Sequence, residues 1–360
     1  MTTQLSILHF DFCILNFKLE MTIVIFIIGI SILILIHELG HFLAAKWFGL
    51  WVEEFGFGFP PRLFKVKRGE TIYSFNLLPF GGFVKIHGEK RDPQEEEKQP
   101  ERSFWFLRIW RRAVIIAAGV IMNLILGWLV ISIIYMIGAS GGILVTNVTP
   151  ETPAAIAGLL EGDRILDFQG SGDFINFVNN SKGEEITFRA LRGEEELAFK
   201  VVPRVDPPAG QGALGISLTE VGFPQLGVFP ALWEGARTSL AILAAIAAAL
   251  GNLIAGIFTG APVLEQFVGP VGIFGIASQA ASFGLVYLLQ LIGLISLNLA
   301  VLNIIPIPAL DGGRLLFLLF EKIKGAPLHP KREMIANAIG FALLLLLMVV
   351  ITVRDVAKLF

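Results

Sequence analysis

One pentapeptide, His37-Glu38-Leu39-Gly40-His41, carries the residue types and spacing of a metal-dependent hydrolase. Two histidines four positions apart project from the same face of a helix, so both imidazoles can bind one Zn²⁺. The glutamate between them can take a proton from the attacking water. The motif lies within a run of apolar residues, where titratable side chains are costly unless they have a function. The combination indicates hydrolysis of peptide bonds at or within a membrane.

Chance produces the same pattern in long sequences, and a histidine pair in a soluble core can be satisfied by its neighbours and by water. That alternative is weaker here, because unpaired polar groups are strongly disfavoured in a bilayer. The chain of 360 residues is 54% hydrophobic and 16% charged, with a mean hydropathy of +0.72. These values are those of a membrane protein rather than of an ordinary soluble domain.

Charge and cysteine content narrow the function further. The net charge of −2 gives no reason to expect a nucleic-acid partner. Cys13 is the single cysteine, which excludes an intramolecular disulfide and a cysteine-based zinc site. The metal must therefore be held by histidine and carboxylate.

Four apolar segments are long enough to cross a bilayer, at about 21–45, 113–138, 285–305 and 336–353. Residues 1–20 lack the positive cluster of a secretory signal. We expect translation to begin at Met21, which would make residues 1–20 an untranslated N-terminal extension.

The distribution of basic residues predicts the orientation. The loop 46–112 and the stretch after the third span are rich in lysine and arginine, whereas 259–284 contains neither. The positive-inside rule places both basic regions on the cytoplasmic side. The basic residues concerned are Lys46, Arg62, Lys65, Lys67, Arg68, Lys85, Lys90, Arg91, Arg108, Arg111, Arg112, Lys322, Lys324, Lys331 and Arg332.

Within the first loop, 55–59 and 71–75 alternate aromatic with smaller residues and are predicted strands. Their aromatic content suggests a sheet against the membrane face, although an ordinary soluble hairpin is the alternative. The charged, polar composition of residues 92–103 predicts a solvated, flexible linker.

A second polar group follows the third span. Pro306 and Pro308 cannot continue a helix, so the backbone groups that they free need protein or water as partners. Asp311 comes directly afterwards and could be the third zinc ligand, leaving a fourth position for water. Taken alone, an aspartate here is more simply a helix cap. The H-E-x-x-H motif favours the ligand, because no other apolar segment offers one.

The requirement that Asp311 reach the histidines constrains the topology. If the alanine-rich segment 238–258 also crossed the membrane, Asp311 would arrive on the wrong side. We therefore expect 222–284 to contain a helix and loop at the outer face.

Residues 141–221, between the second and third spans, resemble a PDZ domain. The resemblance rests on Pro153-Ala154-Ala155-Ile156-Ala157-Gly158-Leu159-Leu160-Glu161-Gly162-Asp163-Arg164-Ile165. Gly158 and Gly162 fit turns flanking a short helix. Leu214, Gly215 and Ile216 resemble the carboxylate-binding loop and its strand, which implies a peptide C-terminus as a ligand. A purely structural role is the alternative.

Together these motifs resemble the site-2 protease family of intramembrane zinc metalloproteases, in its bacterial RseP-like group, over almost everything from Met21 onward. Besides the two metal motifs, the matching segments are Phe55-Gly56-Phe57-Gly58, Pro79-Phe80-Gly81-Gly82-Phe83-Val84, Ala118-Gly119-Val120-Ile121-Met122-Asn123 and Asn303-Ile304-Ile305-Pro306-Ile307-Pro308-Ala309-Leu310-Asp311-Gly312. Many relatives carry two tandem PDZ domains, whereas this chain has room for one.

The resemblance implies one Zn²⁺ bound by His37, His41 and Asp311, with Glu38 as general base. Substrate binding would fall to Asn303, Pro306 and Pro308 and to the sheet, including Gly56 and Gly58. The fold class it implies is a polytopic α-helical membrane protein with four transmembrane helices, a membrane-associated β-sheet and an inserted extracytoplasmic α+β PDZ domain.

The implied protease core consists of residues 21–138 and 285–360, with its metal motif in 303–313. It would lie in the bacterial cytoplasmic membrane, with its active site near the cytoplasmic side. Its substrates would be single-span membrane proteins, such as anti-sigma factors or remnant signal peptides. A catalytically silent, PDZ-bearing scaffold is the alternative, but the intact Glu38 and full ligand set argue against it. A transporter with broken helices would leave H-E-x-x-H unexplained.

Overall fold

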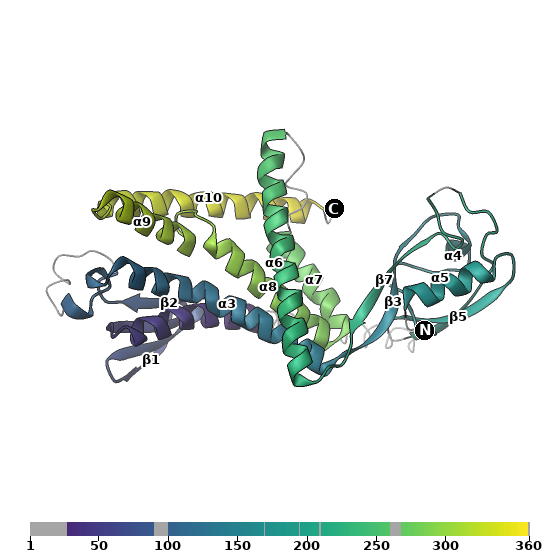
Figure 1. The fold of residues 1–360 in the computed structure, drawn as a ribbon, viewed down its shortest axis with the longest axis horizontal. Coiled ribbons are helices and arrows are strands. Elements are labelled where there is room, and N and C mark those ends of the chain that lie inside the picture. The colour runs from purple at the N-terminus through teal and green to yellow at the C-terminus, as the bar shows by residue number, and fades with distance from the viewer. Residues whose placement is uncertain are drawn as a thin grey trace, which may run out of the picture. The chain divides into compact units, whose positions relative to one another are not determined.

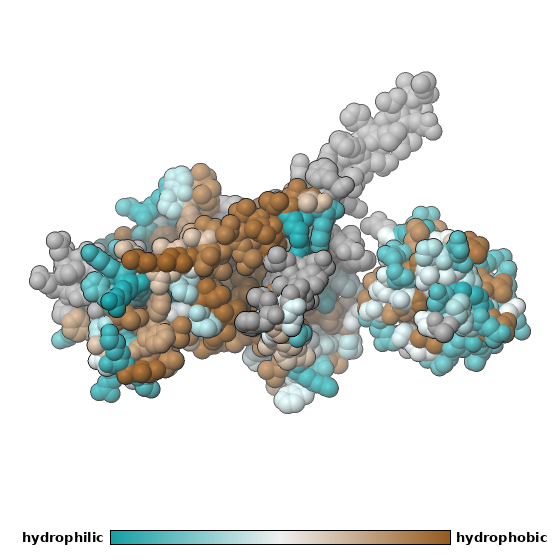
Figure 2. Space-filling view, turned by 90° about the horizontal axis from the view of Figure 1, so that it is seen from above, coloured by the Kyte–Doolittle hydropathy of each residue, from teal (hydrophilic) through white to brown (hydrophobic). Residues whose placement is uncertain are grey.

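The computed structural model describes residues 27–89, 100–168, 170–193, 195–208, 210–259 and 268–358. The predicted extension 1–20 and most of the predicted linker, 92–99, lie outside these residues. The chain divides into two compact units (Figure 1), one within Met1–Ile131 and Gly235–Phe360 and the other Ser132–Glu234. The first unit shows broad hydrophobic surface, whereas the second is mostly hydrophilic outside (Figure 2).

The elements follow one another in a mixed order of helices and strands. In chain order they are the first helix (Ile27–Trp47), β1 (Val52–Arg68), β2 (Thr71–Ile86), the 3₁₀ turns η1 (Pro100–Arg102) and η2 (Phe104–Phe106), α3 (Ile109–Ile137), β3 (Ala139–Val148), α4 (Pro153–Ile156), β4 (Arg164–Ile165), α5 (Ser171–Asn180), β5 (Ile186–Arg192), β6 (Glu195–Val201), β7 (Ile216–Phe223), α6 (Val228–Thr259), α7 (Pro270–Phe283), α8 (Leu285–Ile304), α9 (Asp311–Lys324) and α10 (Pro330–Ala357).

Glycines allow the helices of the first unit to approach closely. A Cβ atom at Gly40 of the first helix would lie 2.3 Å from the carbonyl oxygen of Ala118 in α3. A Cβ at Gly127 of α3 would lie 2.6 Å from the side chain of Leu297 in α8. Close backbone approach at small residues is how helices pack in a bilayer, where no hydrophobic effect drives them together.

Five helices among the described residues are long and apolar enough to cross a membrane. Four of them correspond to the predicted spans, and the fifth, Val228–Leu253, overlaps the segment 238–258 that was predicted to lie at the outer face. The fourth predicted span, 336–353, is part of the longer α10, which begins at Pro330 with His329 as its N-cap. Hydropathy alone does not detect the first turn of α10, because Lys331, Arg332 and Glu333 are charged. Lysine, arginine and glutamate are nevertheless good helix formers. The number of crossings stays a prediction.

Strands β1 and β2 form a sheet in which each strand pairs with its partner more than once. Phe55, in the first part of β1, lies between Tyr73 and Val84 from the two parts of β2. Residues 62–68 then return beside the first part of β2. Residues 82–86 consequently have β1 on one side, and no strand pairs with their other side in the part of the chain that the structure describes. The predicted strands 55–59 and 71–75 are confirmed, and 82–86 forms an edge.

The second unit is built on a five-stranded antiparallel sheet with the order β6-β5-β4-β3-β7. Along β5, Ile186, Phe188 and Ala190 are buried while the residues between them are exposed. This alternation with a period of two turns one face of the strand into the core. Phe174 and Val178, four positions apart on α5, close the same core.

Both glycines that were expected to flank a short helix adopt left-handed backbone conformations. Gly158 has φ 83° and Gly162 has φ 92°, which a residue with a Cβ adopts only at a cost. Both follow α4 rather than flank it, because α4 is begun instead by Thr152, whose side chain accepts a hydrogen bond from the N–H of Ala155.

Candidate metal centre

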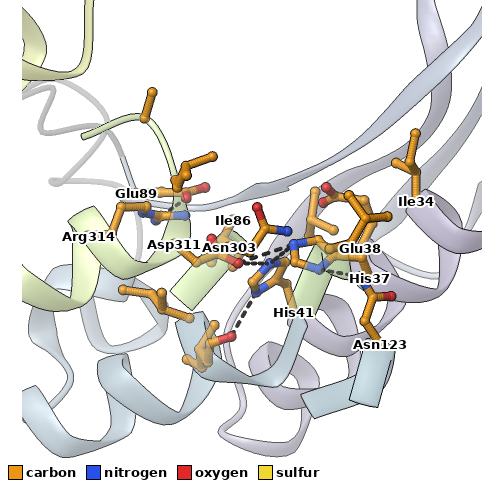
Figure 3. Close-up of a pocket in the computed structure, with 16 residues that line it drawn as sticks. Ile34, His37, Glu38, His41, Ile86, Glu89, Asn123, Asn303, Asp311 and Arg314 are labelled. Atoms are coloured by element: carbon orange, nitrogen blue, oxygen red, sulfur yellow. Dashed lines mark hydrogen bonds and ion pairs between the residues drawn. The ribbon is translucent and has the colours of Figure 1, made fainter. Parts of the chain in front are cut away.

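The first helix brings both histidines of the pentapeptide to one place (Figure 3). The Nε2 atoms of His37 and His41 lie 3.2 Å apart, with the rings edge to face at 83°. Positions four apart are about one turn of α-helix from each other, so the two rings project from the same face of the helix. Both side chains are almost buried, with 12% and 10% of their surface exposed.

Asp311 completes the group from far along the chain. Its Oδ2 atom lies 3.1 Å from His37 Nε2 and 3.3 Å from His41 Nε2. Asp311 is the first residue of α9, whose N-cap is Leu310. The alternative of a capping aspartate is therefore wrong, because the residue in the capping position is the one before it and the Asp311 carboxylate faces the imidazoles.

The turn between α8 and α9 directs this carboxylate. Ala309 has φ 78°, a strained value for a residue with a side chain, and its N–H donates to the Asn337 side chain of α10 at 2.9 Å. A Cβ at Gly312 would lie 2.2 Å from the carbonyl oxygen of Ile304. Because a side chain at this position would collide with the backbone of Ile304, the turn requires glycine.

The donor set fits a zinc ion. One atom from each of His37, His41 and Asp311 lies within 4.8 Å of the others. Asp311 Oδ2 is buried without a hydrogen-bond partner, as expected of an oxygen whose natural partner is a cation. Two imidazole nitrogens and a carboxylate oxygen are typical ligands of catalytic zinc, which keeps a further position open.

A cavity of about 300 Å³ opens beside this group. Glu38 and Asn303 line it together with Val84 and Ile86 from the sheet edge. A Cβ at Gly82, on the same edge, would lie 3.0 Å from Cγ of Glu38. The carboxylate that follows His37 thus faces a space beside the ligand atoms and an open strand edge.

The α3 helix supplies contacts behind the histidines. The carbonyl oxygen of Ile115 accepts a hydrogen bond from His41 Nδ1 at 2.8 Å, and Asn123 lies beside His37 Nδ1. Gly119 lies between them, where a Cβ would come within 2.4 Å of His41 Nε2. In the sequence, Gly119 and Asn123 belong to a segment that matches the family, and no role was predicted for either residue.

Two ion pairs hold α9 against the preceding elements. Arg314 pairs with Glu89, which follows β2. Arg112 in α3 donates to Glu321 at 2.9 Å and lies 3.9 Å from the centre of the Trp105 ring. Arg112 is almost fully buried, and removal of one partner of a buried ion pair is strongly destabilising because it leaves an unpaired charge.

The remaining predicted residues lie in different surroundings. Pro306 and Pro308 belong to the α8–α9 turn, outside the residues lining the cavity, and Pro308 packs against Gly340 of α10. Gly56 and Gly58 lie in the interior part of β1, where a Cβ would meet Phe83 and Leu78. Their visible role is close packing within the sheet.

In the second unit, a groove runs between α5 and β7, with a cavity of about 280 Å³. Leu214, Gly215 and Ile216 line one side of it, and Phe174 and Val178 line the other. The predicted ligand loop therefore borders an apolar groove beside β7, an edge strand of its sheet.

A helical membrane unit with an H-E-x-x-H helix and a distant aspartate defines a membrane-embedded metallopeptidase. Comparison with known proteins agrees: residues 25–347 match the model of Peptidase family M50. The chain belongs to this family, the site-2 proteases, and is a zinc metalloprotease.

Several bacterial members are similar over nearly their full length. The chain is 30% identical to the zinc metalloprotease RasP of Bacillus licheniformis, over 94% of this chain and 99% of that protein. It is 31% identical to the regulator of sigma-W protease RasP of Bacillus subtilis, with the same coverage. A zinc metalloprotease RasP of Shouchella clausii is also 31% identical, again over 94% and 99%.

Proposed function

We propose that this zinc metalloprotease cleaves single-span membrane proteins within the bilayer, with His37, His41 and Asp311 as its zinc ligands and Glu38 as its general base. The observation that carries the proposal is the meeting of His37 Nε2, His41 Nε2 and Asp311 Oδ2 beside a cavity that Glu38 lines. Substrates of the anti-sigma-factor or remnant-signal-peptide type fit, since a relative is named as a regulator of sigma-W.

A bound zinc ion would polarise the scissile carbonyl and make the attacking water more acidic. Glu38 takes the proton from that water and delivers it to the leaving amine. His37, His41 and Asp311 would hold the ion, with the first helix supplying the two imidazoles and α9 the carboxylate. Ile34 and Ile116 line the same cavity as these polar side chains.

A helical substrate must unwind before it is cut, because its carbonyl groups are occupied by internal hydrogen bonds. The edge formed by residues 82–86 offers replacement partners, and Val84 and Ile86 of this edge line the cavity. Addition of a strand to an exposed edge is a common mode of peptide binding. Asn303, which also lines the cavity, can hold a further backbone group of the extended segment.

We also propose that residues 141–221 form a PDZ domain on the extracytoplasmic side, which binds a peptide C-terminus beside β7. The groove between α5 and β7 supports this, since it is apolar and borders an edge strand. The basic loop 46–112 supports a cytoplasmic position for the sheet and, with it, a metal centre near the cytoplasmic face.

The variant Glu38→Gln tests the catalytic assignment. It removes the base while keeping the size of the side chain, so it should bind one zinc per chain and fail to cleave. Expressed in cells, it should accumulate uncut single-span membrane proteins, which mass spectrometry of the captured complexes identifies. Cleavage at the wild-type rate would overturn the assignment of the base, and a trapped pool of soluble proteins would overturn the substrate class.

A further inference from the structure

The two nitrogens of His37 face different neighbours. Nε2 points toward Asp311 and His41, whereas Nδ1 lies 3.4 Å from Nδ2 of the Asn123 amide in α3 (Figure 3). Asn123 is completely buried. Its backbone carbonyl accepts a hydrogen bond from Ser296 in α8 at 2.8 Å.

The amide of Asn123 has one atom without a partner. Its Oδ1 is buried and accepts no hydrogen bond, although a buried amide oxygen without a donor is costly. A half-turn of the amide about its last bond exchanges the positions of Oδ1 and Nδ2, because the two atoms are nearly equal in size. That half-turn brings the unpaired acceptor to His37 Nδ1.

Metal binding decides which orientation is required. A histidine that binds zinc through Nε2 is neutral and carries its proton on Nδ1, which is then a donor. A donor needs an acceptor, and an amide nitrogen is not one. His41 already follows this rule, since its Nδ1 donates to the carbonyl oxygen of Ile115 at 2.8 Å.

We propose that Asn123 is a positioning residue for the metal site, whose Oδ1 accepts the hydrogen bond from His37 Nδ1 when zinc is bound. The contact selects the tautomer of His37 that leaves Nε2 available to the metal and fixes the plane of the ring. One helix, α3, would then orient both histidine ligands, one through a backbone carbonyl and the other through a side chain. The inference rests on the proposed ligand set.

Three variants of the full-length protein in detergent test this role. Asn123→Leu has nearly the same size and no acceptor, Asn123→Asp keeps an oxygen in either orientation, and Ser296→Ala removes the contact to the same backbone without touching the amide. Zinc affinity is measured by competition with a chelator, and the visible spectrum of the Co²⁺-loaded protein reports the ligand field. Removal of the partner of a metal-bound histidine typically weakens metal binding about 10–100-fold.

For Asn123→Leu we expect zinc affinity to fall by this factor and the Co²⁺ spectrum to shift. Zinc affinity should be restored in Asn123→Asp and unchanged in Ser296→Ala. Affinity of Asn123→Leu within about threefold of the wild type would overturn the role. If Asn123→Leu does not fold, a folded Asn123→Asp variant that binds zinc poorly would overturn it equally. The variant His37→Ala separates the two proposals. If His37→Ala loses zinc while Asn123→Leu keeps the wild-type zinc affinity, the role of Asn123 is overturned and the proposed zinc ligands are not.

Discussion

Gly119 lies in α3 at the point where this helix crosses the two histidines. A Cβ atom added there would be 2.4 Å from His41 Nε2 and 2.8 Å from His37 Cε1. Ordinary contacts between such atoms are about 3.5–4.0 Å, so the imidazoles would have to move by roughly 1 Å. Zinc ligand distances tolerate only about ±0.2 Å.

Separation of the first helix and α3 would relieve this clash only by breaking their close packing. Gly40 of the first helix lies against the backbone of Ala118 in α3, where a Cβ would come within 2.3 Å of a carbonyl oxygen. We therefore expect the strain of Gly119→Ala to fall on the imidazoles. We expect zinc affinity to drop by about 100-fold or more, equivalent to roughly 2.7 kcal/mol, and proteolysis to fall with it.

The assay is the metal content of purified Gly119→Ala after dialysis against graded chelator, beside circular dichroism to confirm the helices. Gly127→Ala, on the same helix as Gly119, is the matched control, since its Cβ would meet the flexible side chain of Leu297 in α8. It should keep zinc even if it lowers thermal stability. Wild-type zinc affinity in Gly119→Ala would refute the reasoning, because the added atom could then be accommodated without moving the ligands.

Two other perturbations test neighbouring parts of the structure. Gly82→Ala places a Cβ 3.0 Å from Glu38 Cγ, so it should lower the rate of cleavage about tenfold or more while zinc content stays at the wild-type level; loss of zinc would contradict this. At the turn between β1 and β2, a hydrogen bond from Arg102 lowers the pKa of Glu70 from 4.5 to about 2. A lowered pKa stabilises the folded state above pH 4.5, and that contribution disappears as the pH falls toward 2. The midpoint temperatures of thermal unfolding of the wild type and Glu70→Gln should therefore differ at neutral pH and converge in acid. The difference should be small, because the pair is solvent-exposed. A difference that grows in acid would refute the pairing.

The three proposed ligands could be predicted from the sequence because each lies in or beside a recognisable motif. His37 and His41 share a helix face by their spacing alone. Asp311 was predicted because the H-E-x-x-H motif lacks a third ligand and no other apolar segment offers one. Its exact position, directly after the N-cap, depends on the tight turn at Ala309 and Gly312, and hydropathy says nothing of that turn.

The surroundings of the site could not be predicted in the same way. Which residues of α3 face the histidines depends on the crossing of two helices, so the roles of Ile115 and Asn123 emerge only in three dimensions. The strands were predictable from alternation. Their pairing, which places 55–57 between two neighbouring stretches of β2 and leaves 82–86 at the edge, depends on how β1 and β2 fold back on each other.

The central claim is that one zinc ion is held by two histidines from the first helix and by Asp311. X-ray absorption at the zinc edge of the purified wild-type protein tests it directly. The predicted spectrum has two imidazole nitrogens and oxygen ligands at about 2.0–2.2 Å, and Asp311→Asn should weaken zinc binding while the imidazole signal persists in the metal that remains. A wild-type spectrum without two imidazoles, or an unchanged zinc affinity in Asp311→Asn, would contradict the account.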